Sequence, residues 1–146
     1  MEQVFKSTPN VEKNAMNANL LSIWQQLKPI DISEVLQKSK VNIQDLDLDN
    51  LPIKYQRSHK GYLHGMINRK TKNLHGLARV VLNSRGSIIE GWILNNHLNG
   101  FGRYINPNGC YSLGMHSNNR LNGEGLWVGT DGNMITGVWK DGKLMA

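Results

Sequence analysis

The sequence has one cysteine, few acidic residues in its middle third and no long apolar run. The single cysteine, Cys110, cannot form an internal disulfide, which indicates a reducing compartment. No segment carries the roughly 18 uninterrupted apolar residues that a membrane helix needs. The first residues also lack the charged-then-apolar run of a secretory signal. We therefore expect an intracellular, cytoplasmic protein without a transmembrane segment.

Residue patterns typical of catalysis or metal binding are also missing. The two Gly-x-Gly triplets, at 100–102 and 123–125, neither extend to Gly-x-Gly-x-x-Gly nor precede a P-loop lysine. Cys110 follows a turn glycine and has no evident His–acid pair to activate it. The histidines lack zinc-site spacing and are expected at solvated turn or strand positions: His59, His64, His75, His97 and His116. We expect no enzyme activity, no cofactor and no metal site.

The positive charge is concentrated in one part of the chain. The net charge is +6, yet residues 54–120 contain ten Lys and Arg and a single acid, Glu90. Such a block can attract acidic protein tails or anionic lipids, whereas nucleic acid ranks last because aromatic residues are not interleaved with the charges. Simple solvation is the alternative. The predicted basic patch consists of Lys54, Arg57, Lys60, Arg69, Lys70, Lys72, Arg79, Arg85 and Arg103.

Glycines recur with a period of 23 residues in four separate series, which indicates an internal repeat. The repeat glycines are Gly86, Gly109 and Gly132; Gly91, Gly114 and Gly137; Gly100 and Gly123; and Gly102 and Gly125. Each unit contains a polar turn such as Leu94-Asn95-Asn96-His97, whose asparagines tolerate left-handed backbone. A second turn, Asn106-Pro107-Asn108-Gly109, has strong breaker chemistry. The pattern predicts consecutive β-hairpins, with the in-strand glycines covered by an aromatic ring from a neighbouring hairpin.

Residues 61–146 resemble the MORN repeat, whose pattern is roughly Tyr-x-Gly-x-Trp, a polar turn, Gly-x-Gly and a turn ending in Gly. The best local match runs from Ile135 to Leu144, with Gly137, Trp139 and the Lys-Asp-Gly-Lys turn. The predicted fold is mainly β, a single-layer elongated antiparallel sheet. Its units are a degenerate first repeat at 61–88, full repeats at 89–111 and 112–134, and a partial one at 135–146.

The first 60 residues do not show the repeat and form a separate helical and extended segment. Apolar residues at helical spacing predict one helix over residues 10–28. Asp31 and Glu34 predict the N-cap and capping box of a second helix, with Ile30 and Val35 as its hydrophobic staple. Residues 43–55 alternate acids with apolar residues, and Pro52 indicates an extended or edge segment there. The helices are expected either to cap the sheet or to dock onto another subunit.

Five aromatic residues are the candidates for binding a partner: Trp24, Trp92, Tyr104, Trp127 and Trp139. The alternative is that they pack between hairpins and stabilise the sheet. Aromatic side chains dominate many interfaces, so both roles are open. The leading hypothesis is a non-catalytic scaffold or adaptor that binds proteins within a larger assembly, which the family resemblance implies is cytoskeletal or ciliary. Homodimerisation through the last repeat, a membrane tether using the basic patch, and a regulatory subunit of a separate enzyme are the alternatives.

Overall fold

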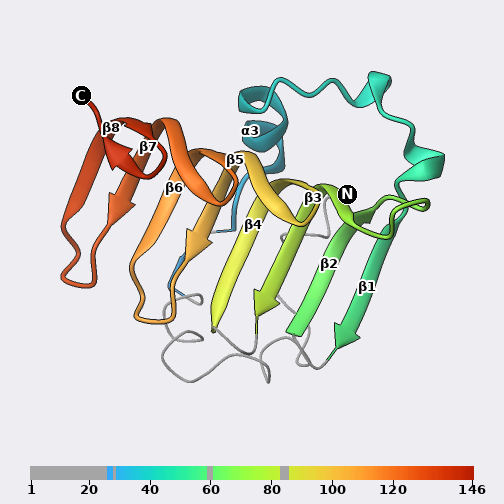
Figure 1. Cartoon of the computed structure of the whole chain (residues 1–146), viewed down its shortest axis with the longest axis horizontal. Helices are drawn as coiled ribbons and strands as arrows, with labels where there is room; N and C mark the ends of the chain where they lie inside the picture. Colours follow the sequence, from blue (N-terminus) through green and yellow to red (C-terminus); the bar gives the residue numbers. More distant parts are fainter. Residues whose placement is uncertain (1–25, 28, 59–60, 83–85) are drawn as a thin grey trace.

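The described residues form one open, nine-stranded antiparallel sheet in which every strand pairs with its neighbours in sequence (Figure 1). This is a computed structural model, and it describes residues 26–27, 29–58, 61–82 and 86–146. The strands are β1 (Ile53–Ser58), β2 (Gly61–Ile67), β3 (Leu74–Leu82), β4 (Ser87–Leu94), β5 (His97–Ile105), β6 (Tyr111–Ser117), β7 (Arg120–Val128), β8 (Met134–Lys140) and β9 (Lys143–Leu144). The expectation of a mainly β, single open sheet is confirmed.

A short helix, α3 (Ile32–Lys38), precedes the sheet and begins where the sequence predicted. The Asp31 carboxylate caps it by accepting a hydrogen bond of 2.9 Å from the Ser33 amide. Ile30 and Val35 are both buried in one apolar cluster, as a hydrophobic staple requires. The helix predicted over residues 10–28 falls almost wholly outside the described residues. Among the described helices, none has the length and apolar character to cross a membrane.

The segment between α3 and the sheet differs from the prediction of an extended chain over residues 43–55. It contains two 3₁₀ turns, η2 (Ile43–Asp45) and η3 (Leu48–Asn50). The first is initiated by the Asn42 side chain, which accepts a hydrogen bond of 3.0 Å from the Gln44 amide and so favours a turn. The chain is extended only from Ile53, and β1 pairs with β2. The sheet therefore begins before residue 61, where the repeat domain was expected to start.

The polar turns inside the hairpins have the backbone that the sequence predicted. Asn95 and Asn96, and Asn118 and Asn119 one repeat later, all have positive φ, between 49° and 70°. Two consecutive residues with positive φ make the tight turn whose twist matches that of antiparallel strands. Gly109 lies in the connection between hairpins, again with positive φ. The 23-residue period is thus the period of one hairpin and its connection.

A row of small residues crosses the sheet along the line where the hairpins bend, and we call this row the crease. Its members pair across consecutive strands and are Gly65, Ala78, Gly91, Gly102, Gly114, Gly125 and Gly137. A Cβ added at Gly91 would lie 2.5 Å from the Cα of Gly102, so only bare backbone fits. The pairing register shifts just after Gly65, Gly91 and Gly114. The expected aromatic cover is therefore wrong at Gly91 and Gly114, where close approach of two backbones requires the glycine.

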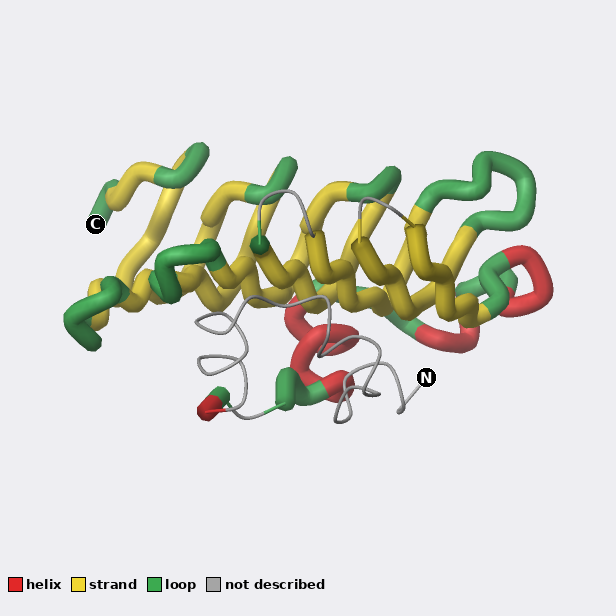
Figure 2. The backbone as a smooth tube through the Cα atoms, turned by 90° about the horizontal axis from the view of Figure 1, so that it is seen from below, coloured by secondary structure: helices red, strands yellow, loops and turns green. Residues whose placement is uncertain are grey.

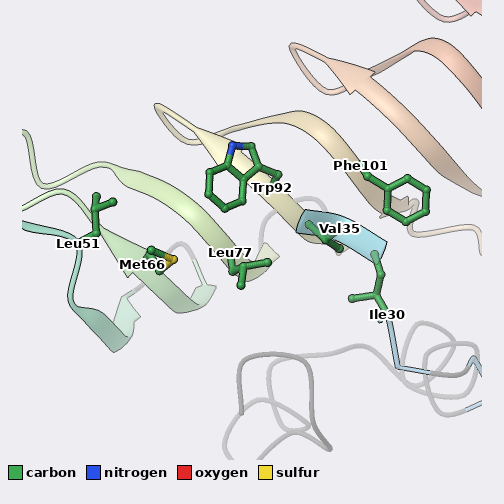
Figure 3. Packing of buried hydrophobic residues seen from close by; sticks show 7 residues of the cluster. All are labelled: Ile30, Val35, Leu51, Met66, Leu77, Trp92 and Phe101. Carbon is green, nitrogen blue, oxygen red and sulfur yellow. The ribbon is translucent and has the colours of Figure 1, made fainter. Parts of the chain in front are cut away.

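Beyond this crease the hairpin turns fold over one face of the sheet, while α3 lies against the other (Figure 2). We call these the groove face and the helix face. On the helix face α3 packs on β4 and β5, and an apolar cluster continues from Val35 to Met66, Leu77, Trp92 and Phe101 (Figure 3). The Phe101 amide also donates a hydrogen bond of 2.9 Å to the Ser39 hydroxyl at the end of α3. α3 therefore covers the middle of the helix face.

Asparagine side chains join the tips of neighbouring hairpins, and we call this series of hydrogen bonds the asparagine ladder. Asn96 accepts a hydrogen bond of 2.9 Å from the Leu74 amide, and Asn119 accepts one of 2.8 Å from the Leu98 amide. The corresponding position of the last hairpin is Gly142, whose amide donates to the Leu121 carbonyl but which has no side chain. Every tip is therefore bonded to its neighbour, but at the last repeat the asparagine side chain is missing and the Gly142 amide and an Asn122–Asp141 hydrogen bond make the link. These bonds align the tips along one rim of the groove face.

Candidate functional site

The floor of the groove face is a row of side chains that crosses the strands. Cross-strand pairing aligns these residues, one from each strand from β2 to β8: Leu63, Val80, Ile89, Tyr104, Ser112, Trp127 and Ile135. Because side chains alternate between the two faces of a strand, all seven project to the same side. The first four are apolar or aromatic, and they pack with the buried cluster of Ile67, Ala78, Ile93 and Leu98.

A hollow of about 380 Å³ lies over the first part of this row. Leu63, Val80, Ile89 and Tyr104 contribute to its lining from the strands. The folded-over turns contribute Lys72, Asn96 and Asn119. The volume falls within the range of ligand pockets, roughly 300–1,000 Å³. The arrangement is an apolar floor with a polar rim along one side, which can bind a ligand that carries both kinds of group.

The crease brings together a serine and a histidine that are four residues apart in β6. In a straight strand Ser112 and His116 would be about 13 Å apart, yet Ser112 Oγ lies 2.8 Å from His116 Nε2. His116 Nδ1 lies 2.9 Å from the Gly114 carbonyl, which can only accept, so Nδ1 carries the proton and Nε2 accepts from the hydroxyl.

His116 is a buried, neutral histidine. Burial lowers the pKa of His116 to about 4, although its hydrogen bond to Gly114 acts in the opposite direction. The expectation of a solvated position is wrong for His116, because the bend encloses its ring. Its position is equivalent to Ile93 and Trp139 in the adjacent repeats, both of which are also buried. The Ser112–His116 pair therefore closes the bend in the hairpin, with a backbone carbonyl where a hydrolase triad would have a carboxylate.

The structure separates the predicted partner-binding aromatic residues. Tyr104 and Trp127 lie in the floor row and are half-buried. Trp139 also projects to the groove face but is 8% exposed, and its Nε1 donates a hydrogen bond of 2.9 Å to the Gly125 carbonyl. Trp92 lies on the helix face in the cluster under α3 and is 6% exposed. Its predicted role as a partner contact is therefore corrected to packing, and Trp24 lies outside the described residues.

Two arginines of the predicted basic patch are buried. Arg79 and Arg103 bind the Glu90 carboxylate from the flanking strands, with N–O distances of 2.9 and 3.0 Å. Although burial opposes the charge of Glu90, the guanidinium groups of Arg79 and Arg103 keep its pKa below the usual value. The assignment of Arg79 and Arg103 to a basic patch is therefore wrong, because both groups are held inside the helix face by a buried carboxylate.

The remaining basic residues are spread over the structure. Lys54 is exposed on β1, while Arg69, Lys70 and Lys72 are exposed in the β2–β3 turn. Lys60 and Arg85 lie outside the described residues, as does the side chain of Arg57. Among the described side chains of the patch, the one that lines the hollow is Lys72. Apart from Lys54, the exposed basic residues of the patch that the structure describes thus lie in one turn.

Sequence reasoning missed the asparagine ladder, the Ser112–His116 pair and the Glu90 ion cluster. The signal for the ladder was present, because Asn73, Asn96 and Asn119 share the 23-residue period. The single acid within a basic block, Glu90, was also visible in the sequence and is the signal that points to an ion pair with neighbouring arginines. The Ser112–His116 contact had no visible signal, since it depends on a bend that brings distant positions of one strand together.

Neither protein-family models nor curated proteins give a match to this chain. The MORN resemblance of residues 61–146 therefore stays a proposal. Among the described residues, His, Cys, Asp and Glu side chains do not gather in a group of three that could hold a metal ion.

Proposed function

We propose that this protein is a non-catalytic, MORN-like scaffold or adaptor that binds a protein partner in the groove. The observation that carries the proposal is the floor row, which leads from the apolar hollow to Trp127 on the groove face. Tyr104 and Trp127 are half-buried, so each keeps surface that a partner can cover. Partly exposed aromatic side chains in a concave site are typical binding anchors.

The direction of the groove favours an extended segment held by its side chains. Neighbouring strands are about 4.8 Å apart, so the seven positions of the floor row span roughly 29 Å. An extended peptide of about nine residues covers that distance. Because it would cross the strands, it could not pair with them as an added strand, and the floor side chains would supply most of the contact.

The membrane-tether alternative loses support from the same structure. Two of its nine basic residues are buried against Glu90, and those that are exposed among the described residues lie mainly in one turn. Stable electrostatic binding to anionic lipid takes a larger cluster of cations, at about 1 kcal/mol each. Protein binding through the groove is therefore the function that the geometry supports best.

The test is quantitative affinity capture from native cell extract with the wild-type chain and single-residue variants. Tyr104→Ala and Trp127→Ala should each reduce capture of the specific partner by at least tenfold, because an aromatic anchor contributes about 2 kcal/mol. Tyr55→Ala is the matched control. Tyr55 is the same residue type, 41% exposed, but lies on the helix face beside Tyr62 and His64.

Each variant should first be compared with wild type by circular dichroism and thermal unfolding. Folded Tyr104→Ala and Trp127→Ala proteins that capture the same partners as wild type, in equal amounts, would contradict the groove proposal. Liposome sedimentation at two salt concentrations provides a separate check, because a membrane tether would bind anionic vesicles and lose them as salt rises.

A further inference from the structure

The chemistry of the hollow narrows the class of partner. We propose that the groove selects an extended, acidic peptide segment, with a large apolar side chain in the hollow and a nearby carboxylate paired with Lys72. This inference rests on the proposed function and adds the composition of the partner to it.

The floor of the hollow accounts for the apolar side chain. Leu63, Val80, Ile89 and Tyr104 cover three strand spacings, roughly 14 Å, which corresponds to four or five residues of extended peptide. A peptide with only polar side chains would not cover the apolar floor, which would then stay in contact with water. Burying one large aliphatic or aromatic side chain of a ligand tightens binding by roughly ten- to a hundredfold. A peptide with one or two large apolar residues in such a span therefore fits the hollow best.

The rim accounts for the carboxylate. Lys72 is the one charged residue among those lining the hollow, as far as the chain is described. Arg69 from the same turn is directed elsewhere, because its Nε donates a hydrogen bond of 2.6 Å to the Asp49 carbonyl. Lys70 is also exposed in this turn but does not line the hollow. An aspartate, a glutamate or a terminal carboxylate on the ligand would complement this rim.

The strands and turns that form the hollow carry little negative charge to compete with such a ligand; outside them, Asp49 contacts the β2–β3 turn through its backbone carbonyl, at Arg69. Glu90 is the only acid in residues 54–120, and it is fully buried between Arg79 and Arg103. The strands that form the hollow therefore present no acidic side chain of their own to Lys72. Charge complementarity favours an acidic segment over a basic or neutral one with the same apolar residue.

The experiment uses a positional-scanning array of nine-residue peptides as the probe, incubated with the purified full chain. The wild-type chain should select peptides with a large apolar residue and an Asp or Glu within a few positions. Resynthesised peptides should then bind with an affinity that falls at high salt. Lys72→Glu should weaken them by roughly three- to tenfold, as expected for a partly exposed ion pair replaced by like charges. It should also shift selection toward Lys and Arg.

Lys70→Glu is the matched control, because it makes the same charge change in the same turn at a residue that does not line the hollow. It should retain the wild-type preference. If Tyr104→Ala abolishes binding while Lys72→Glu selects the same peptides with unchanged affinity, the acidic preference is overturned and the groove remains the site. If wild type selects no peptide, or Tyr104→Ala leaves every selected peptide bound, both proposals are overturned.

Discussion

The two faces of the sheet use the same strands but have opposite environments. The helix face is closed over β4 and β5 by α3, and it buries Trp92 and the Glu90 ion cluster. The groove face is overhung by its own hairpin turns and leaves a hollow above Tyr104. One face provides much of the stability, and the other provides a surface that remains available for a ligand.

A one-residue difference decides which face an aromatic side chain occupies. Ile93, His116 and Trp139 are 23 residues apart and equivalent in the repeat, whereas Trp92 is one position earlier. Since side chains alternate along a strand, this shift moves Trp92 to the opposite face from Trp139. Two repeats can therefore both contain a tryptophan in this strand, and the two rings have the same role only if they occupy the same position of the repeat.

The largest expected effect is on the helix face, from Trp92→Ala. Removing this ring from the cluster under α3 should lower the free energy of unfolding by about 4 kcal/mol, because it leaves a cavity in a packed region. Trp127→Ala on the groove face should cost about 1 kcal/mol, since that ring is only half-buried. Urea unfolding of both variants measures the difference, and equal losses would contradict the division between the faces.

The next effect concerns the buried ion cluster. Glu90→Gln should lower the free energy of unfolding by about 3 kcal/mol, because two buried guanidinium groups lose their carboxylate. Glu34→Gln is the matched control, since its ion pair with Lys38 is 3.6 Å long and well exposed. That change should cost about 0.5 kcal/mol or less. Similar losses in the two variants by urea unfolding would show that Glu90 is not needed to compensate the arginines.

On the groove face, His116 should make the protein sensitive to acid. Its pKa is about 4 when folded against an ordinary value of 6.5, so the unfolded chain binds the proton first. Its contribution is present above pH 6.5 and is lost as the pH falls from there toward 4. The free energy of unfolding should drop by roughly 2–3 kcal/mol between pH 7.5 and 4.5.

His116→Gln is the comparison, because glutamine does not titrate and the variant should therefore lose this part of the pH dependence of the free energy of unfolding. His64, whose pKa is also lowered by burial and by Arg79, contributes in the same direction in both proteins. Glu90, with a lowered pKa, loses its contribution only below its ordinary value of 4.5. A pH dependence unchanged by His116→Gln between 6.5 and 4.5 would rule out His116 as the cause.

The smallest expected effect is a gain, from completing the asparagine ladder at the last hairpin. Gly142 has φ +82°, close to the φ of Asn96 and Asn119, and a Cβ there would meet nothing closer than 3.9 Å. Gly142→Asn should therefore raise the free energy of unfolding by about 1 kcal/mol through a hydrogen bond to the Leu121 amide. Asn119→Ala should do the reverse, and thermal unfolding that fails to separate the two variants would argue against the ladder.

The hairpins, their turns and the cap of α3 could be predicted because each depends on local chemistry. Asn95 and Asn96 adopt the turn that their side chains favour, and Asp31 caps the helix that follows it. The crease and the two faces could not, because they depend on how strands from different repeats approach each other. The hollow could not be predicted either, since Lys72 and Tyr104 line it together only because the turns fold over the sheet.

Because the groove runs across the strands, its length depends on the number of repeats. Each 23-residue unit adds two strands, so a duplicated copy of residues 112–134 would lengthen the groove by roughly 9–10 Å, or about three residues of extended ligand. The asparagine hydrogen bonds link each hairpin tip to the adjacent hairpin, so such an insertion should leave the rest of the array unchanged. The number of repeats therefore sets the length of the peptide segment that the groove can bind.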